Sequence, residues 1–315
     1  MTKVHTVRPT DLVALVAYDG RVYPNESVTR DRIGTEASPH PLEAALEQWL
    51  SFATARHTWI SVKGATLRGL VSARRRGSKG AWEIDCLIDA AEDDAGVLTS
   101  LLERVIADAG RAGAEKVFLR VPAASDAVER VRHAGFRAYV TERLLARRSA
   151  AQAPSAVDGV EGMRRWGRAD AQPAFRLYNR CTPEPVRRVE AATFREWLAA
   201  QERLSPGGRA RQRVIERDGR IVGWLRAAAA GELGRFDVIA DPSEPAVLDT
   251  LIDTALGLLG EQTRLFTLAP EFATGLRERL ERRGFAQEGE YAVLARQTAQ
   301  TVELPALAPA QTTVA

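Results

Sequence analysis

The sequence predicts an α/β fold made of two tandem copies of one domain, each with a mixed, mostly antiparallel sheet flanked by helices. An internal repeat is the first observation behind this prediction: GFRAYVTERLLAR at 135–147 is echoed by GFAQEGEYAVLAR at 284–296. In both segments a Gly-Phe pair is followed after the same interval by Leu-Ala-Arg. A repeat period of roughly 150 residues is typical of two domains rather than of a solenoid.

An apolar helix face that occurs twice is the second observation. The first face contains Val97, Leu98, Leu101, Leu102, Val105 and Ile106, and the second contains Val247, Leu248, Leu251, Ile252, Ala255 and Leu256. Apolar residues at this spacing predict an amphipathic helix that packs against a sheet. Each copy therefore has such a helix upstream of its Gly-Phe pair.

Each copy is predicted to contain the same elements in the same order. A strand and a segment with Arg and Asp lead into a first helix, VRPTDLVALV in one copy and MRRWGRADAQPAFRLY in the other. A strand, a turn and a strand follow at 59–75 and 213–229, and the second turn carries the hairpin dipeptide Asp-Gly. After another strand and the amphipathic helix we expect a strand at 116–121 or 264–269, a helix and a terminal strand pair.

The domain boundaries follow from composition. Small residues and Pro without an apolar period predict a linker at 149–158, between domains at 1–148 and 159–298. The tail at 299–315 has Pro and Ala, few charges and no helical period. We therefore expect the tail to be disordered.

The composition is typical of a soluble globular protein, and the sparse use of cysteine leads us to expect a cytoplasmic location. The apolar fraction is 45% and the charged fraction 27%, and a net charge of +3 gives little reason to expect nucleic-acid binding. No apolar stretch approaches the roughly 20 residues of a membrane span, so no membrane partner is expected. The first residues also lack the apolar core of a signal peptide. The two cysteines, Cys86 and Cys181, have no neighbour at metal-ligand spacing, so no metal is expected.

The order of elements, together with DAVERVRHAGFRAYVTERLLARR and RDGRIVGWLRAAA, resembles the GNAT N-acetyltransferase superfamily, as a tandem pair. This resemblance implies a central strand that bends away from its neighbour, with acetyl-CoA or another acyl-CoA in the gap. The pyrophosphate then lies on the following loop and at the N-terminus of the next helix, where backbone N–H groups and the helix dipole neutralise it. The implied activity is acyl transfer from acyl-CoA to an amine.

Both cofactor loops depart from the glycine-rich pattern of the family. The first loop has Asp93 and Asp94 at pattern positions and keeps only Gly96, and the second, DPSEPAVLDTLI, has no glycine. Asp93, Asp94 and Glu244 are interpreted as residues that cap a helix and favour its dipole. Because the first copy keeps one loop glycine, we expect it to bind the acyl-CoA. The implied cofactor-binding residues are Leu87, Ile88, Ala95, Gly96, Val97, Leu98, Thr99 and Ser100.

Acid–base groups are predicted only in part. The general-acid Tyr of the family falls on Val131 and Leu280, while Tyr139 and Tyr291 lie beyond the Gly-Phe pairs. A general base must accept the proton of the attacking ammonium group, and a partly buried carboxylate suits that task. The candidate bases are Glu83, Asp85 and Asp237, which have the alternative interpretation of a polar strand face over a solvated groove.

Two functions remain open at this point. The first is a GNAT-like N-acyltransferase with an unknown small-molecule or peptide amine as acceptor. The amphipathic helical segment at 183–204 resembles the acceptor-side helices of the family, and the alternative is a helix that covers the sheet. The second is a catalytically inactive tandem protein that acts as a binding or scaffold module with a protein partner. The incomplete loops and the absence of the family's Tyr in both copies motivate this alternative.

Overall fold

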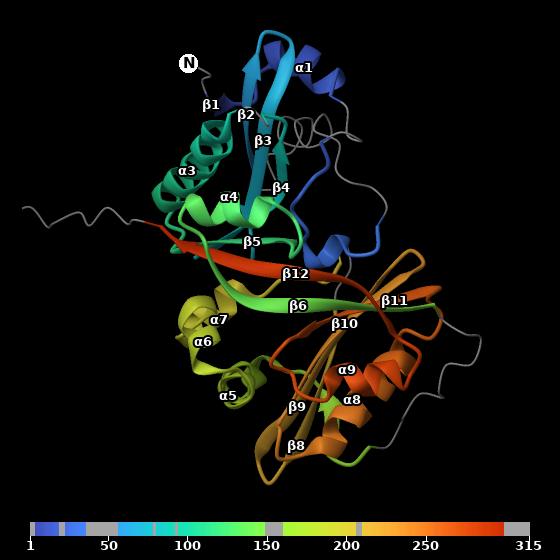
Figure 1. The fold of residues 1–315 in the computed structure, drawn as a ribbon. Coiled ribbons are helices and arrows are strands. Elements are labelled where there is room, and N and C mark those ends of the chain that lie inside the picture. The colour runs from blue at the N-terminus through green and yellow to red at the C-terminus, as the bar shows by residue number, and fades with distance from the viewer. Residues whose placement is uncertain are drawn as a thin grey trace, which may run out of the picture.

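The computed structural model describes residues 4–18, 23–35, 56–77, 80–91, 94–148, 160–205 and 210–298. The predicted linker at 149–158, the predicted tail at 299–315 and Asp93 of the first loop lie outside these residues. In the described parts of the chain, helices flank one mixed sheet, which confirms the predicted α/β class (Figure 1). None of the helices there is long and apolar enough to cross a membrane.

The two halves contain similar elements. The strands of the first half are β1 (Val4–Thr6), β2 (Arg56–Lys63), β3 (Thr66–Arg75), β4 (Ala81–Asp89), β5 (Lys116–Pro122) and β6 (Arg137–Arg148). Its helices are η1 (Pro9–Asp11), α1 (Leu12–Val16), η2 (Arg30–Arg32), α3 (Ala95–Arg111) and α4 (Ala127–His133). The strands of the second half are β7 (Met163–Arg165), β8 (Arg211–Arg217), β9 (Arg220–Ala230), β10 (Leu233–Ala240), β11 (Arg264–Pro270) and β12 (Ala286–Gln297). Its helices are η3 (Arg168–Asp170), α5 (Ala171–Cys181), α6 (Glu184–Glu190), α7 (Phe194–Ala200), α8 (Pro245–Leu258) and α9 (Leu276–Glu281).

The sheet joins both halves through their last strands. In the described residues the strand order is β1-β2-β3-β4-β5-β12-β6-β11-β10-β9-β8-β7. The pairs β4–β5 and β10–β11 are parallel, and the other pairs are antiparallel. Figure 1 shows β6 and β12 side by side between the two halves.

The predicted terminal strand pair in each half is wrong. Each half ends in a single long strand, and the neighbouring place in the sheet is filled by the last strand of the other half. Thus β12 pairs with β5 of the first half, and β6 pairs with β11 of the second half. The exchange satisfies the backbone groups on the open edges of β5 and β11, which an isolated half would leave unpaired.

The two amphipathic helices pack as their apolar faces predict. Residues of α3 and α8 form the centres of two separate buried clusters against the sheet. A glycine on the strand beneath leaves room for each helix. A Cβ atom at Gly69 of β3 would lie 2.8 Å from Leu101 of α3, and one at Gly223 of β9 would lie 2.6 Å from Val247 of α8. The internal repeat therefore extends to the close approach between helix and sheet.

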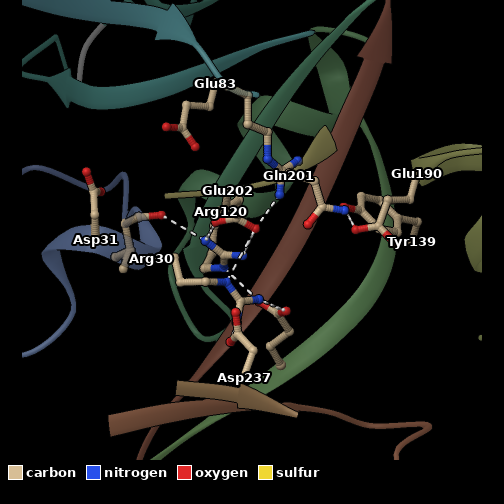
Figure 2. Close-up of polar contacts among 12 residues, drawn as sticks. Arg30, Asp31, Glu83, Arg120, Tyr139, Glu190, Gln201, Glu202 and Asp237 are labelled. Atoms are coloured by element: carbon tan, nitrogen blue, oxygen red, sulfur yellow. Dashed lines mark hydrogen bonds and ion pairs between the residues drawn. The ribbon is translucent and has the colours of Figure 1, made fainter. Parts of the chain in front are cut away.

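A buried ionic cluster lies where the two halves meet (Figure 2). Arg30 of the first half contacts Glu142 at 2.7 Å and also pairs with Asp237 of the second half. Arg120 on β5 contacts Glu142 and Glu202, each at 2.8 Å. The pairs of Glu142 lie within the first half, whereas Arg30–Asp237 and Arg120–Glu202 cross between the halves, so these two pairs form only when the halves are together.

Glu202 is the centre of this cluster. Besides Arg120, it pairs with Arg76, which follows β3. Burial alone would raise the pKa of Glu202, but the guanidinium groups of Arg120, Arg76 and Arg30 together hold that pKa well below its usual range. The carboxylate is therefore ionised at neutral pH, and its loss would leave buried positive charge uncompensated.

Splitting the chain tests the strand exchange. Made separately, fragments 1–148 and 160–298 should each fail to give a stable folded monomer, that is, a monomer that unfolds cooperatively on heating. The reason is that each fragment lacks the strand that covers the edge of β5 or β11. Mixed in equal amounts, the fragments should form a heterodimer with cooperative unfolding. Light scattering after size exclusion and circular dichroism would measure both properties. A stable monomer from one fragment alone would contradict the exchange.

Replacement of Glu202 tests the ionic cluster. Glu202→Gln should lower the free energy of unfolding by roughly 3–5 kcal/mol, because buried arginines lose their partner. The control Glu281→Gln removes an exposed partner of Arg277 and should cost less than about 1 kcal/mol. Because the pKa of Glu202 is lower in the folded than in the unfolded chain, its contribution is present above the usual glutamate range and is lost as the pH falls below it. Urea unfolding across pH should show this acid-side loss in the native chain and a smaller one in Glu202→Gln.

Candidate ligand site between strands β10 and β11

Each half contains a parallel strand pair that separates along its length. β4 and β5 are paired at Ala81–Glu83, and β10 and β11 are paired at Leu233–Arg235. Beyond these residues neither β4 nor β10 is paired with its parallel neighbour. The sheet therefore has two gaps, at related positions of the two halves, whose edges carry backbone N–H and C=O groups that need other partners.

The first gap is filled by the chain itself. The N–H of Glu26 donates to the carbonyl of Leu87 on β4 at 2.8 Å, and the N–H of Val28 donates to the carbonyl of Arg120 on β5 at 2.9 Å. The Leu87 N–H donates to the side-chain oxygen of Asn25, and the Ser27 hydroxyl donates to the carbonyl of Ile84. Residues 25–28 thus bridge both strands. The cavity beside them measures only about 10 Å³, which suffices for a single water at most.

The predicted cofactor-binding residues surround this filled gap. Leu87 and Ile88 are buried on β4, and the backbone of Leu87 is already bonded to Asn25 and Glu26. Val97 and Leu98 of α3 are buried in the core, whereas Gly96 and Ser100 are exposed and Thr99 is half-buried. Ala95 is the first residue of α3. A cofactor role for these residues stays a prediction.

The acidic residues at the two helix starts behave differently. Asp94 is the N-cap of α3, and its carboxylate accepts a hydrogen bond from the Gly96 N–H at 3.1 Å, which confirms the predicted cap. Glu244 occupies the N-cap position of α8, but its carboxylate makes no hydrogen bond to the helix and pairs with Arg217, so the predicted side-chain cap is wrong there. Pro245, the first residue of α8, provides no N–H donor.

The second gap opens onto a cavity of about 340 Å³, a size typical of small-molecule sites. Its walls include β10 from Asp237 to Ala240, the start of α8, and the connection from β11 to α9. The apolar lining comprises Val238, Ile239, Leu248, Leu268, Phe272, Leu276, Trp197 and Trp224, among others. Three polar residues of the first half, Arg30, Arg76 and Glu142, also line it. The cavity thus extends from the second gap to the junction between the halves.

The structure separates the three predicted bases. Glu83 and Asp85 lie beside the first gap, where Glu83 accepts from the Nε of Arg74 at 2.7 Å and Asp85 pairs with Arg56. Burial raises the pKa of Glu83, although Arg74 opposes that shift. Asp237 lines the cavity of the second gap. Its two carboxylate oxygens accept from two arginines, Arg30 and Arg226.

Sequence reasoning missed a carboxylate with two tyrosine partners. Glu190, the last residue of α6, accepts a hydrogen bond from the hydroxyl of Tyr178 on α5 at 2.9 Å and from that of Tyr139 on β6 at 3.5 Å. Burial raises the pKa of Glu190, while Arg76 and the Tyr178 hydroxyl oppose the shift. Glu190 lines the same cavity. Figure 2 shows it next to Tyr139 and Gln201, apart from the ionic cluster.

A β-bulge explains why Tyr139 reaches this carboxylate. Val140 pairs with Val293 of β12, and Ala138 pairs with Leu294, so Tyr139 is an extra residue without its own partner. A bulge breaks the alternation of side chains and turns one of them to a different direction. Tyr139 lies 51 residues before Glu190 and Tyr178 lies 12 residues before it, so no short sequence motif links the three.

No metal site is evident in the described ranges, where no group of three or more His, Cys, Asp or Glu side chains is arranged to hold an ion. The candidate site offers carboxylates, guanidinium groups, tyrosine hydroxyls and an apolar wall. Such a set can orient a polar ligand and accept or donate a proton.

Two solved structures resemble the chain along nearly its whole length. One is a GCN5-related N-acetyltransferase from Sphaerobacter thermophilus, with 15% identity and a TM-score of 0.52, covering 95% of this chain and 98% of that one. The other is a tandem GNAT protein from the clavulanic acid biosynthesis pathway, with 12% identity and a TM-score of 0.51, covering 96% of this chain and 100% of that one. No protein-family model and no curated protein matches the sequence. The chain therefore has the fold of a tandem GNAT protein, as the sequence resemblance predicted.

Proposed function

We propose that the protein transfers an acyl group from an acyl-CoA to an amine, and that its second half binds the acyl-CoA. One observation carries this proposal. The gap between β10 and β11 opens onto a cavity of about 340 Å³, whereas residues 25–28 fill the gap between β4 and β5. The GNAT resemblance places the acyl carrier in such a gap, so the open gap is the better candidate.

The lining of the second gap fits the acyl end of this ligand. Val238 and Ile239 on β10, with Leu248 and Phe272 opposite, would form apolar walls around an acyl-pantetheine arm. The start of α8 suits the phosphates less well, because Pro245 gives no N–H and no loop glycine is present. Arg279, which lines the cavity and pairs with Asp249, and the dipole of α8 are positive groups at this end of the cavity.

Of the three predicted bases, Asp237 stays our candidate for the reaction because it lines this cavity. The first half would then have a structural role, supplying Arg30, Arg76 and Glu142 to the site. The division into domains at 1–148 and 159–298 and the cytoplasmic location are part of this proposal.

An inactive binding module is the second candidate function. The glycine-free loop DPSEPAVLDTLI of the second half favours it, since that loop offers few backbone donors to a pyrophosphate. In that case the cavity would hold another ligand, or a protein partner would bind elsewhere. Binding of acetyl-CoA distinguishes the two functions.

Titration calorimetry with acetyl-CoA tests which gap is used. We expect about one site per chain. Ala273→Glu should weaken binding at least about tenfold, because Ala273 lines the cavity and a carboxylate there would occupy space and repel phosphates. The matched control is Ala124→Glu. Ala124 is exposed and lies as far before the first Gly-Phe pair as Ala273 lies before the second, so this change should leave acetyl-CoA affinity unchanged.

A further variant tests the first half directly. Gly96→Glu should leave acetyl-CoA affinity unchanged if the second gap is the site. If Gly96→Glu abolishes binding and Ala273→Glu does not, the prediction from the sequence, that the cofactor binds to the first half at residues between Leu87 and Ser100, is confirmed. If the native chain does not bind acetyl-CoA at all, the acyltransferase proposal fails in favour of the binding module.

A further inference from the structure

Glu190 differs from the other carboxylates that line the cavity. Glu142, Glu202, Asp237 and Asp241 each form an ion pair with an arginine. Among the residues that the structure describes, no cation lies within ion-pair distance of the Glu190 carboxylate; Lys116 approaches only its backbone carbonyl. Its polar contacts are the two tyrosine hydroxyls. Among the carboxylates that line the cavity, Glu190 thus has no ion-pair partner in the described parts of the chain.

The two tyrosines leave part of this carboxylate free for a ligand. An ionised carboxylate has about four acceptor positions, and the hydroxyls of Tyr178 and Tyr139 use one on each oxygen. A primary ammonium has three donors and matches the remaining positions with charge-assisted hydrogen bonds. Arg76, the cation that most influences Glu190, is itself paired with Glu202.

Aromatic rings adjoin this carboxylate. Trp197 and Trp224 both line the cavity, and their ring centroids are 5.6 Å apart. The ring of Tyr178 lies 6.4 Å from that of Trp197. Such rings bury apolar groups and attract cations over their faces. The surroundings of Glu190 therefore favour a ligand with a positive group attached to an apolar body.

From this arrangement we propose that Glu190, held by Tyr178 and Tyr139, binds the ammonium group of the acceptor, a primary amine with an apolar or aromatic body. The site is composite, because Tyr139 comes from β6 of the first half while Glu190 and Tyr178 come from the second half. The proposal rests on the acyltransferase function for the meaning of "acceptor", but the binding of an amine does not require acyl-CoA. Glu190 rather than Asp237 is thus the residue that receives the amine.

Calorimetry on the intact chain, without acyl-CoA, tests this site. The probes are phenethylamine and its uncharged counterpart 2-phenylethanol. The amine should bind at least about tenfold more tightly than the alcohol, because only the amine forms a charge-assisted bond with Glu190. Glu190→Gln should weaken the binding of the amine by a similar factor and leave the affinity for the alcohol unchanged. The control Glu184→Gln, on the exposed side of the same helix, should bind the amine as the native chain does.

Tyr178→Phe provides a second variant if Glu190→Gln does not fold. It removes one hydrogen bond to the carboxylate and should change amine affinity several-fold without changing the affinity for the alcohol. Equal affinity of the native chain for amine and alcohol, or an unchanged amine affinity in Glu190→Gln, would overturn the proposal. Amine binding that depends on Glu190 in a chain that does not bind acetyl-CoA would support this site and reject the acyltransferase function.

Discussion

The pairing of β6 with β12 is the constraint on which the rest of the structure depends. It joins two repeated units into one sheet, and it covers the edges of β5 and β11 with a strand from the other half. It also determines what the first half contributes to the second. Because β6 lies beside β11, Glu142 reaches Arg30 and the cavity, and the bulge at Tyr139 directs that side chain to Glu190. A site in the second half is therefore built partly from the first.

The two gaps have different contents although the strands around them follow the same plan. In the first half, residues 25–28 form backbone contacts with both β4 and β5, as an added strand segment does. In the second half, the chain before β8 forms α5, α6 and α7 instead, and these helices line a cavity. The single glycine of the first loop, Gly96, carries less information about ligand binding than the identity of the segment beside the gap. The proposal that the two related domains are used unequally rests on this difference.

Local patterns account for much of the fold and little of the site. The amphipathic faces of α3 and α8, the repeat and the Asp94 cap were all readable because each depends on residues close together in the sequence. The filled gap depends on contacts such as those between Val28 and Arg120, which lie 92 residues apart in the sequence. The strand exchange and the Glu190–Tyr139 pair also depend on long-range register, which periodicity does not encode. Asp237 was found because it lies on a strand before a recognisable loop, whereas Glu190 ends a helix of another segment.

The buried charges at the junction have a cost and a consequence. Moving paired guanidinium and carboxylate groups out of water is unfavourable, and hydrophobic residues of similar size would often stabilise the interface more. The pairs between the halves are specific, however: Arg30 meets Asp237, and Arg120 meets Glu202, only when the halves adopt this arrangement. Such pairing fixes the position of β6 relative to β10, and with it the distance between Tyr139, Glu190 and the second gap. In the described residues these arginines pair with Glu142, Glu202 and Asp237 and none forms an ion pair with Glu190. The proposed cationic ligand would use the remaining acceptor capacity of that carboxylate.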